Sequence, residues 1–371
     1  MDFYNPHSTD FIFIPLSYRI LGKKPLLKYS YLGKIKLKNQ KFVFDFRESS
    51  FFTKKFIKKY FYLLIPVLFV EIIFWCSLNK ISIKKICFVS KKLNNSNSKL
   101  FLMTYKSMAD LDERTENFFN SYSHIYAHLT HYFIRTKEKA ENILKLKAPI
   151  TLLGDSNFSQ NSYYLKYFQK KKINFEILPF RPDNRFFLKD SSSPRLRRLY
   201  SGGTTHQLQL EKPKNFYEDF RTFFGVNAYH TVRPYLLNHK LNFLDVSQTP
   251  WSDQAKMIRV NSHFKNDLVG VFNRYLAVTY GSELSGAPSI SNLEAICCGA
   301  IALIDKKYVE GLPLIEGIDF IHIDEHAKNI QKELKKAFEL LLKRLPNLQN
   351  TITFRERFDF FLNQQIEKIF I

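Results

Sequence analysis

The sequence predicts an α/β protein with two domains, each built on a parallel sheet. The chain has 371 residues, 45% of them are hydrophobic, and short apolar runs alternate with amphipathic stretches along most of it. This length accommodates two domains with separate cores. Strands that alternate with helices pair in parallel, and ligands on such sheets bind beyond the carboxyl ends of the strands.

Charge and cysteine usage narrow the class of protein. Lys and Arg total 56 against 34 Asp and Glu, and this net charge of +22 favours nucleic acid, anionic lipid or phosphorylated partners. A solvated surface encoded by an AT-biased gene explains the same count. The four cysteines form no C-x-x-C pair, which indicates reduced thiols, and the start MDFYNPHSTDF lacks a signal-peptide pattern. We therefore expect a cytoplasmic protein.

The first domain is expected over residues 1–178. Strands are expected at 10–16, within 34–46, and at 85–90, 100–105, 148–153 and 174–178, and helices at 110–122, 136–146 and 159–170. The apolar run 61–78 lies between lysines and contains Pro66 and Glu71. It fits a buried helix or an interfacial helix on anionic lipid. A membrane-spanning helix fits it less well, because a carboxylate in mid-bilayer is costly.

The first domain contains candidate catalytic groups. His124, His128 and His131 are spaced i, i+4, i+7, so on a helix they would share one face and could bind a metal, but the same stretch also fits a strand at 125–129. Because histidine titrates near neutrality, His128 is a candidate base, the alternative being a partly buried histidine at a strand end. Asp155 follows a predicted strand, where it fits a general base or a turn or helix cap.

The second domain is expected over residues 196–345, after a proline- and serine-rich linker at 179–195. It opens with a strand at 196–200 and a loop that contains Gly202 and Gly203. Glycines in such a loop permit positive φ and close approach of a phosphate, although an ordinary tight turn also uses them. Amphipathic helices are expected at 327–345 and 353–370.

The most informative stretch begins at Arg274 and ends at Asp324. It predicts a strand at 275–280, a polar loop at 281–288, a helix at about 292–298 and strands at 300–304 and 320–323. Ser289 or Ser291 can cap the helix, and Glu294 completes a capping box with Ser291. Ser289 and the free N–H groups at the helix start suit an anion, and Glu294 can accept hydrogen bonds from ribose hydroxyls. The loop therefore lies where a nucleotide would bind.

The motif SISNLEAICCGAIALID, followed by GLPLIEGIDFI, resembles the donor-binding region of GT-B glycosyltransferases, in the style of exostosin-like and bacterial surface-polysaccharide enzymes. The resemblance implies two Rossmann-like domains with a cleft between them, and a C-terminal segment at 346–371 that crosses back to the first domain. It implies that Glu294 holds the donor ribose and that Ser289 and Asn292 lie near the phosphates. It also implies no metal and no cofactor besides the nucleotide-sugar donor.

Many retaining GT-B enzymes carry a second glutamate eight residues before the first. That position here is Gly286, and the nearest acid is Glu283, which becomes a candidate catalytic group. Basic side chains can hold the diphosphate as the glycosidic bond breaks, and Arg198 and Arg274 are the leading candidates, with Arg197 and Arg259 beside them.

These observations lead us to expect a glycosyltransferase of bacterial surface polysaccharide synthesis. It would move a sugar from a nucleotide sugar to a glycan or lipid-linked acceptor, peripheral to the inner face of the membrane and without a nucleic-acid partner. The net charge supports an alternative, a non-enzymatic polyanion-binding protein. A GT-B type nucleotide-sugar epimerase is a second alternative and would need no acceptor.

Overall fold

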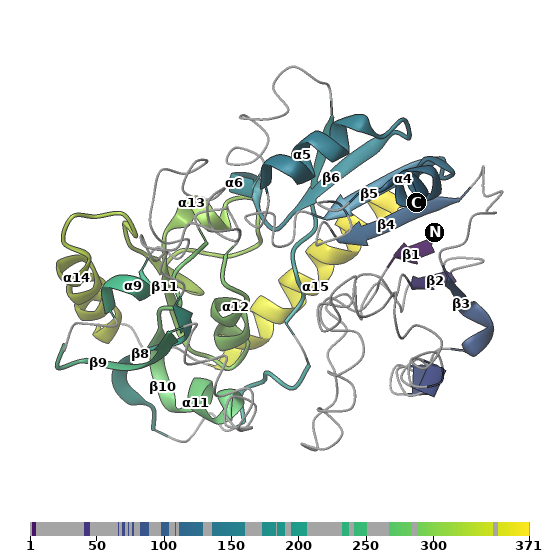
Figure 1. Ribbon diagram of the computed structural model, residues 1–371. Coiled ribbons are helices and arrows are strands. Elements are labelled where there is room, and N and C mark those ends of the chain that lie inside the picture. Colours follow the sequence, from purple (N-terminus) through teal and green to yellow (C-terminus); the bar gives the residue numbers. More distant parts are fainter. Residues whose placement is uncertain are drawn as a thin grey trace. The chain divides into compact units, whose positions relative to one another are not determined.

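We describe the protein from a computed structural model (Figure 1). The structure describes residues 2–4, 41–44, 66, 69, 70, 73, 76, 77, 82–88, 98–103, 108, 111–128, 136–159, 173–182, 184–189, 194–205, 232–236, 241–250, 267–283, 288–343 and 348–370. The chain forms two compact units. The first is Met1–Leu153 with Ile173–Phe175, and the second is Gly154–Lys172 with Glu176–Ile371.

The first unit is built on a sheet in the order β3-β2-β1-β4-β5-β6-β7. Its strands are β1 (Asp2–Tyr4), β2 (Lys41–Phe44), β3 (Ile86–Phe88), β4 (Lys99–Met103), β5 (His124–His128), β6 (Ile150–Gly154) and β7 (Asn174–Ile177). Neighbouring strands from β3 through to β6 pair in parallel. The helices α4 (Glu113–Asn120) and α5 (Thr136–Lys145) and the short 3-10 helix η3 (Ile83–Lys85) belong to the same unit.

These elements confirm most of the order predicted for the first unit. The predicted strand 10–16 and nearly all of the predicted helix 159–170 lie outside the described residues. Within the apolar run 61–78, the described positions 66, 69, 70, 73, 76 and 77 are all helical. Among the described residues, no helix has both the length and the apolar character needed to cross a membrane.

The second unit is built on a five-stranded parallel sheet in the order β12-β11-β10-β8-β9. Its strands are β8 (Leu196–Thr205), β9 (Leu244–Pro250), β10 (Tyr275–Val278), β11 (Ile301–Ile304) and β12 (Phe320–His322). Its helices are α6 (Asn157–Ser159), α9 (Arg233–Leu236), α11 (Leu268–Arg274), α12 (Ile290–Cys297), α13 (Lys306–Val309), α14 (Ile330–Leu342) and α15 (Leu348–Phe370). The α/β class and the two parallel sheets are thus confirmed.

Helices cover both faces of the second sheet (Figure 1). On one face, α14 packs with α9 against the sheet through a core that includes Leu334, Leu303 and Ile321. Because side chains alternate along a strand, Ala302 and Ile304 point to the opposite face, where they are buried on the side of α12. Truncating a core side chain such as Leu334 to alanine costs about 2–5 kcal/mol, so these contacts fix the strand ends firmly.

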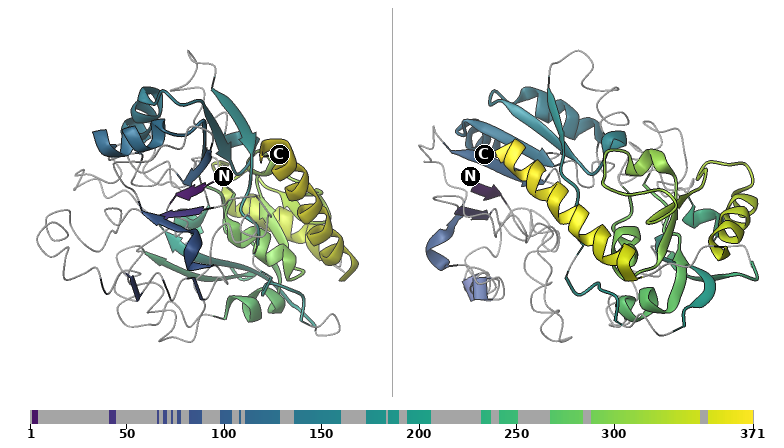
Figure 2. Two further views of the ribbon diagram at one scale, coloured as in Figure 1. Left: turned by 90° about the vertical axis from the view of Figure 1, so that its right-hand side faces the viewer. Right: turned by 180° about the vertical axis from the view of Figure 1, so that it is seen from behind.

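The predicted linker is fastened to the second unit. Arg181 forms a two-pronged ion pair with Asp359 on α15, with Nε–Oδ1 and Nη2–Oδ2 distances of 2.7 Å. Arg355 on α15 donates to the Phe186 carbonyl at 2.6 Å, and Phe186 is 1% exposed. The long helix α15, yellow in Figure 2, therefore belongs to the same compact unit as these linker residues.

Candidate functional site

Polar groups gather where the strands of the second sheet end. Because the strands run parallel, the carboxyl ends of β8, β10, β11 and β12 lie along one edge, which we call the carboxyl edge. Buried polar side chains follow three of these strands: Ser282 after β10, Asp305 after β11 and Glu325 after β12. Ligands on parallel sheets bind beyond the carboxyl ends of the strands, so the carboxyl edge is the expected place for a ligand.

Two glycines bring the backbone of β8 close to other groups at this edge. Gly203 has a φ of 89°, in the left-handed region that favours glycine. A Cβ on Gly203 would stand 3.2 Å from Nη1 of Arg233, and a Cβ on Gly202 would stand 2.8 Å from the Tyr200 hydroxyl. Both glycines lie inside β8, because this strand continues past the predicted end at residue 200.

Arg233, the first residue of α9, is the main group that sequence reasoning missed. Its side chain is buried, with 7% exposed. Nε donates to the Tyr280 carbonyl at 2.6 Å, and Nη2 donates to the Ser289 hydroxyl at 2.9 Å. The guanidinium carbon lies 5.5 Å from the centre of the Tyr280 ring. One permanent cation therefore stands between the end of β8, the end of β10 and the start of α12.

Ser289 precedes α12 as its N-cap residue, but its side chain does not cap the helix. The hydroxyl instead accepts from Arg233. The N–H groups in the first turn of any helix have no carbonyl partner within the helix and carry partial positive charge. Together with Arg233 they make the start of α12 suitable for an anion such as a phosphate. Ser289 occupies the N-cap position and α12 begins at Ile290. Ser291 is therefore already inside the helix, and the predicted capping box from Ser291 to Glu294 does not begin it.

Asn292 holds the loop that precedes α12. Its Oδ1 accepts from the Tyr280 N–H at 3.1 Å, and its Nδ2 donates to the Gly281 carbonyl at 3.3 Å. The side chain is 1% exposed. Asn292 therefore lies near the predicted phosphate position, with its amide engaged by the backbone.

Glu294 lies one turn into α12 and is half-buried. Burial is the largest cause of the raised pKa of Tyr280, and the charges of Tyr200 and Glu294 add to it while Arg233 opposes it. This coupling places the Glu294 carboxylate near the same cluster. Among the described residues the Tyr280 hydroxyl meets no partner in hydrogen-bond geometry. The neighbouring Tyr200 hydroxyl pairs with Ser247.

Glu325 joins three strand ends and was also missed from the sequence. Its Oε2 accepts from the Ser282 N–H at 2.8 Å. Its Oε1 accepts from the Asp305 N–H at 3.0 Å and from the Ser282 hydroxyl at 3.2 Å. Glu283, the predicted catalytic acid of this loop, follows Ser282 directly and is half-buried.

The two predicted phosphate-binding arginines lie elsewhere on the sheet. Arg198, in the first half of β8, forms a two-pronged ion pair with Asp245, with distances of 2.8 Å and 2.6 Å. Arg274 is exposed at the end of α11, directly before β10 begins. The amino ends of parallel strands lie opposite their carboxyl ends, so Arg274 does not share an edge with Gly203 and Ser289. Arg259 lies outside the described residues.

The candidate catalytic groups after the first-sheet strands are both buried. His128 ends β5 and is 0% exposed, and Asp155 follows β6 and is 6% exposed. The Asp155 carboxylate accepts from the Phe180 N–H at 3.3 Å, a contact across 25 residues of sequence and not the local hydrogen bond of a turn or a helix cap. His124 and His128 occupy one strand and stand about 13 Å apart at 3.3 Å per residue, too far to share a metal ion. His131 lies outside the described residues.

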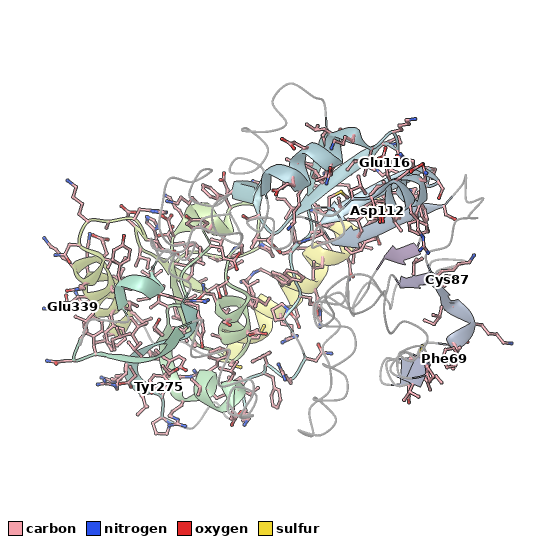
Figure 3. The ribbon with its side chains drawn as sticks, in the orientation of Figure 1. Phe69, Cys87, Asp112, Glu116, Tyr275 and Glu339 are labelled. Atoms are coloured by element: carbon pink, nitrogen blue, oxygen red, sulfur yellow. The ribbon has the colours of Figure 1, made fainter. Side chains whose placement is uncertain are left out.

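One D-x-D triplet, Asp110–Leu111–Asp112, merits attention as a metal site. Asp112 caps α4 (Figure 3), accepting from the Thr115 N–H at 2.9 Å and from the Thr115 hydroxyl at 2.6 Å. Asp110 lies outside the described residues. In the part of the chain that the structure describes, no three His, Cys, Asp or Glu side chains gather as a metal site.

No protein-family model matches the chain, and neither does any curated protein sequence. Among solved structures, it resembles Anabaena HepE in complex with UDP-glucose, with a TM-score of 0.46 and 9% identity over 99% of this chain and 98% of HepE. It resembles T4 phage BGT in complex with UDP-glucose, with a TM-score of 0.43 and 12% identity over 100% of both chains. The pneumococcal O-GlcNAc transferase GtfA, in complex with UDP and GlcNAc, matches 74% of this chain with a TM-score of 0.38 and 13% identity. This chain spans 56% of GtfA.

Proposed function

We propose that the protein is a glycosyltransferase that transfers a sugar from a nucleotide-sugar donor bound at the carboxyl edge of the second sheet. The observation that carries this proposal is the meeting of Gly203, Arg233 and Ser289 at the start of α12. The reaction breaks the bond between the sugar and the diphosphate, so negative charge develops on the leaving group. A buried guanidinium, a hydroxyl and a helix N-terminus stabilise that charge without a metal ion.

The other residues have separate roles in this proposal. The backbone at Gly203 allows the diphosphate to approach closely, and Glu294 accepts hydrogen bonds from the ribose. Asn292 and Glu325 hold the loop between β10 and α12. His128, Asp155 and Glu283 remain the candidates for the group that accepts the proton of the attacking acceptor hydroxyl.

The proposed acceptor is a glycan or a lipid-linked glycan of the bacterial surface, reached from the membrane face. The described helical residues of the run 61–78 support this contact, since Phe69, Val70 and Ile73 are 51%, 63% and 40% exposed. Figure 3 labels Phe69. The exposed Lys84 and Lys85 follow in the chain and complement anionic headgroups. Co-sedimentation with phosphatidylglycerol vesicles tests this contact, and Phe69→Glu should reduce it. Equal sedimentation of the variant and the wild type would refute the proposed contact of Phe69 with the membrane.

Calorimetric titration of the protein with UDP, GDP, CMP and their sugars, without added metal, tests the donor site. We expect saturable binding of one nucleotide. Arg233→Gln should weaken this binding at least tenfold, because a charge-assisted hydrogen bond contributes about 1.5–3 kcal/mol. The matched control is Arg185→Gln, which removes the same charge from an exposed position and should bind as the wild type does.

Other results would favour the alternative functions. Binding of heparin or nucleic acid with a steep salt dependence, and of no nucleotide, would point to a polyanion-binding protein, for which the +22 net charge is the supporting observation. Interconversion of a nucleotide sugar without any acceptor would point to an epimerase.

A further inference from the structure

The buried carboxylate of Glu325 contacts the segments that follow three neighbouring strands of the second sheet. Glu325 follows β12 and is 1% exposed. One of its oxygens binds the backbone after β10 at Ser282, and the other binds both Ser282 and the backbone after β11 at Asp305. The contacts span 43 and 20 residues of sequence, so one side chain adds to the backbone pairing that already joins β10 to β11 and β11 to β12.

The segment that Glu325 holds leads directly to the proposed phosphate site. Ser282 begins the loop that ends at Ser289, whose hydroxyl accepts from Arg233. The same loop is held at its start by Asn292, through Tyr280 and Gly281. Ser282 also forms an isolated antiparallel bridge with Pro288, the residue before Ser289. A change in the position of Ser282 therefore displaces the start of α12.

We propose that Glu325 is a positioning residue for the donor site, which sets the place of Ser289 and the start of α12 relative to Arg233 without touching the donor. This inference rests on the proposed function. Donor affinity would then depend on a residue that does not contact the donor.

The charges around Glu325 indicate how this control depends on pH. Asp305 faces it from the start of α13, with Lys307 3.0 Å and His322 3.8 Å from the Asp305 carboxylate. Asp324 and His326 flank it in the chain, and the His326 ring bonds to the Tyr308 hydroxyl at 2.8 Å. Burial raises the pKa of Glu325 to about 7, the N–H donors of Asp305 and Ser282 lower it, and the charge of Asp305 raises it.

Glu325 therefore changes its charge in the neutral range. A carboxylate accepts hydrogen bonds more strongly than a protonated acid does. Burial outweighs this gain, because the pKa of Glu325 is raised in the folded protein. The contacts of Glu325 consequently hold the loop less tightly above pH 7 than below it.

Glu325→Gln tests this role, because an amide has one acceptor oxygen and cannot accept from N–H groups at both ends. UDP affinity is measured by calorimetry from pH 6 to pH 8.5. In the wild type we expect affinity to fall several-fold as the pH rises through 7. At pH 6 the variant should bind UDP at least tenfold more weakly than the wild type, and it should lack this fall. The control Glu316→Gln removes an exposed charge from the same unit and should keep the wild-type profile.

Amide hydrogen exchange provides a readout that needs no ligand. In Glu325→Gln, the amides of Ser282, Asp305 and the loop to Asn292 should exchange faster, while α14 stays protected as in the wild type. Unchanged exchange in this loop, or a pH profile of UDP affinity equal to that of the wild type, would overturn the proposal. If the wild type binds no UDP, the donor assignment fails for this nucleotide, and exchange still decides the role of Glu325.

Two milder variants keep the test open if the amide variant does not fold. Ser282→Ala removes one of the three contacts and should weaken UDP binding two- to threefold. Glu325→Asp retains a carboxylate on a shorter side chain, so it should recover the pH-dependent step in part. Full wild-type affinity in Ser282→Ala together with no step in Glu325→Asp would contradict the proposal.

Discussion

Replacing Gly203 with alanine should have two effects, a loss of stability through backbone strain and a loss of nucleotide affinity through Arg233. An L-residue at a φ of 89° costs about 1–2 kcal/mol. Alanine also lowers the conformational entropy of the unfolded chain, which stabilises the folded state by about 0.4–1 kcal/mol. The net loss of stability is therefore about 1 kcal/mol, which corresponds to a fall of about 2–4 °C in Tm for a unit of this size.

The added Cβ also acts on Arg233. It would stand 3.2 Å from Nη1 and 3.3 Å from the guanidinium carbon, so the guanidinium has to move. Because its contacts with Tyr280 and Ser289 measure only 2.6 Å and 2.9 Å, even a small displacement weakens one of them. The loss of one charge-assisted hydrogen bond at about 1.5 kcal/mol corresponds to about a tenfold loss of nucleotide affinity.

Gly299→Ala is the matched control. Gly299 has a φ of 82° and follows the C-terminal end of α12, about 12 Å along the helix from Ser289 at 1.5 Å per residue. Its alanine variant should lose similar stability in thermal unfolding followed by circular dichroism. It should keep wild-type nucleotide affinity in calorimetry, whereas Gly203→Ala should not. Equal affinities in the two variants would refute the placement of Arg233 at the donor site.

Two further predictions concern buried titratable groups. Because the pKa of Glu325 rises from 4.5 to about 7 on folding, its contribution to stability is fully present below pH 4.5 and is lost as the pH rises through 7. At about 1.4 kcal/mol per pKa unit, the stability of the wild type relative to Glu325→Gln should fall by about 3 kcal/mol between pH 4.5 and pH 8 in urea unfolding; a constant difference would contradict it. Burial raises the pKa of Cys297 and of Cys298 to about 12, so both thiols should resist iodoacetamide at pH 8 in the folded protein and react after unfolding, as peptide mass spectrometry would show. Rapid alkylation of the folded protein would disprove their burial.

The sequence predicts the central strand–helix–strand unit closely, because its signals are local. The predicted strand 300–304 is β11 at Ile301–Ile304, and the predicted helix near 292–298 is α12 at Ile290–Cys297. Continuous apolar runs, a serine before the helix and a glycine after it lie within a few residues of each other. The predicted donor-site residues Gly203, Ser289 and Asn292 consequently meet at one edge.

The residues that sequence reasoning missed act over long separations. Arg233 contacts groups 47 and 56 residues away, and nothing near it distinguishes it from a surface arginine. The sequence Asp-Glu-His around Glu325 is typical of an exposed turn, whereas the Glu325 side chain is buried in the structure. Arg274 was expected to start a strand, but the seven residues Leu268–Arg274 form α11 first. Only the register of the parallel strands shows which edge each side chain occupies.

The ion pair between Arg181 and Asp359 has a consequence for how the protein is made. It joins the beginning and the end of the second unit across 178 residues, and α15 also buries Phe354, Phe358 and Leu362. A contact of such sequence separation forms late, because the intervening chain has to be ordered first. During synthesis the chain emerges from its N-terminus, so the rest of the second unit leaves the ribosome before α15. The second unit therefore cannot complete its fold until α15 has emerged, and a premature stop before residue 348 would release a chain whose α15-facing apolar surface stays open to aggregation.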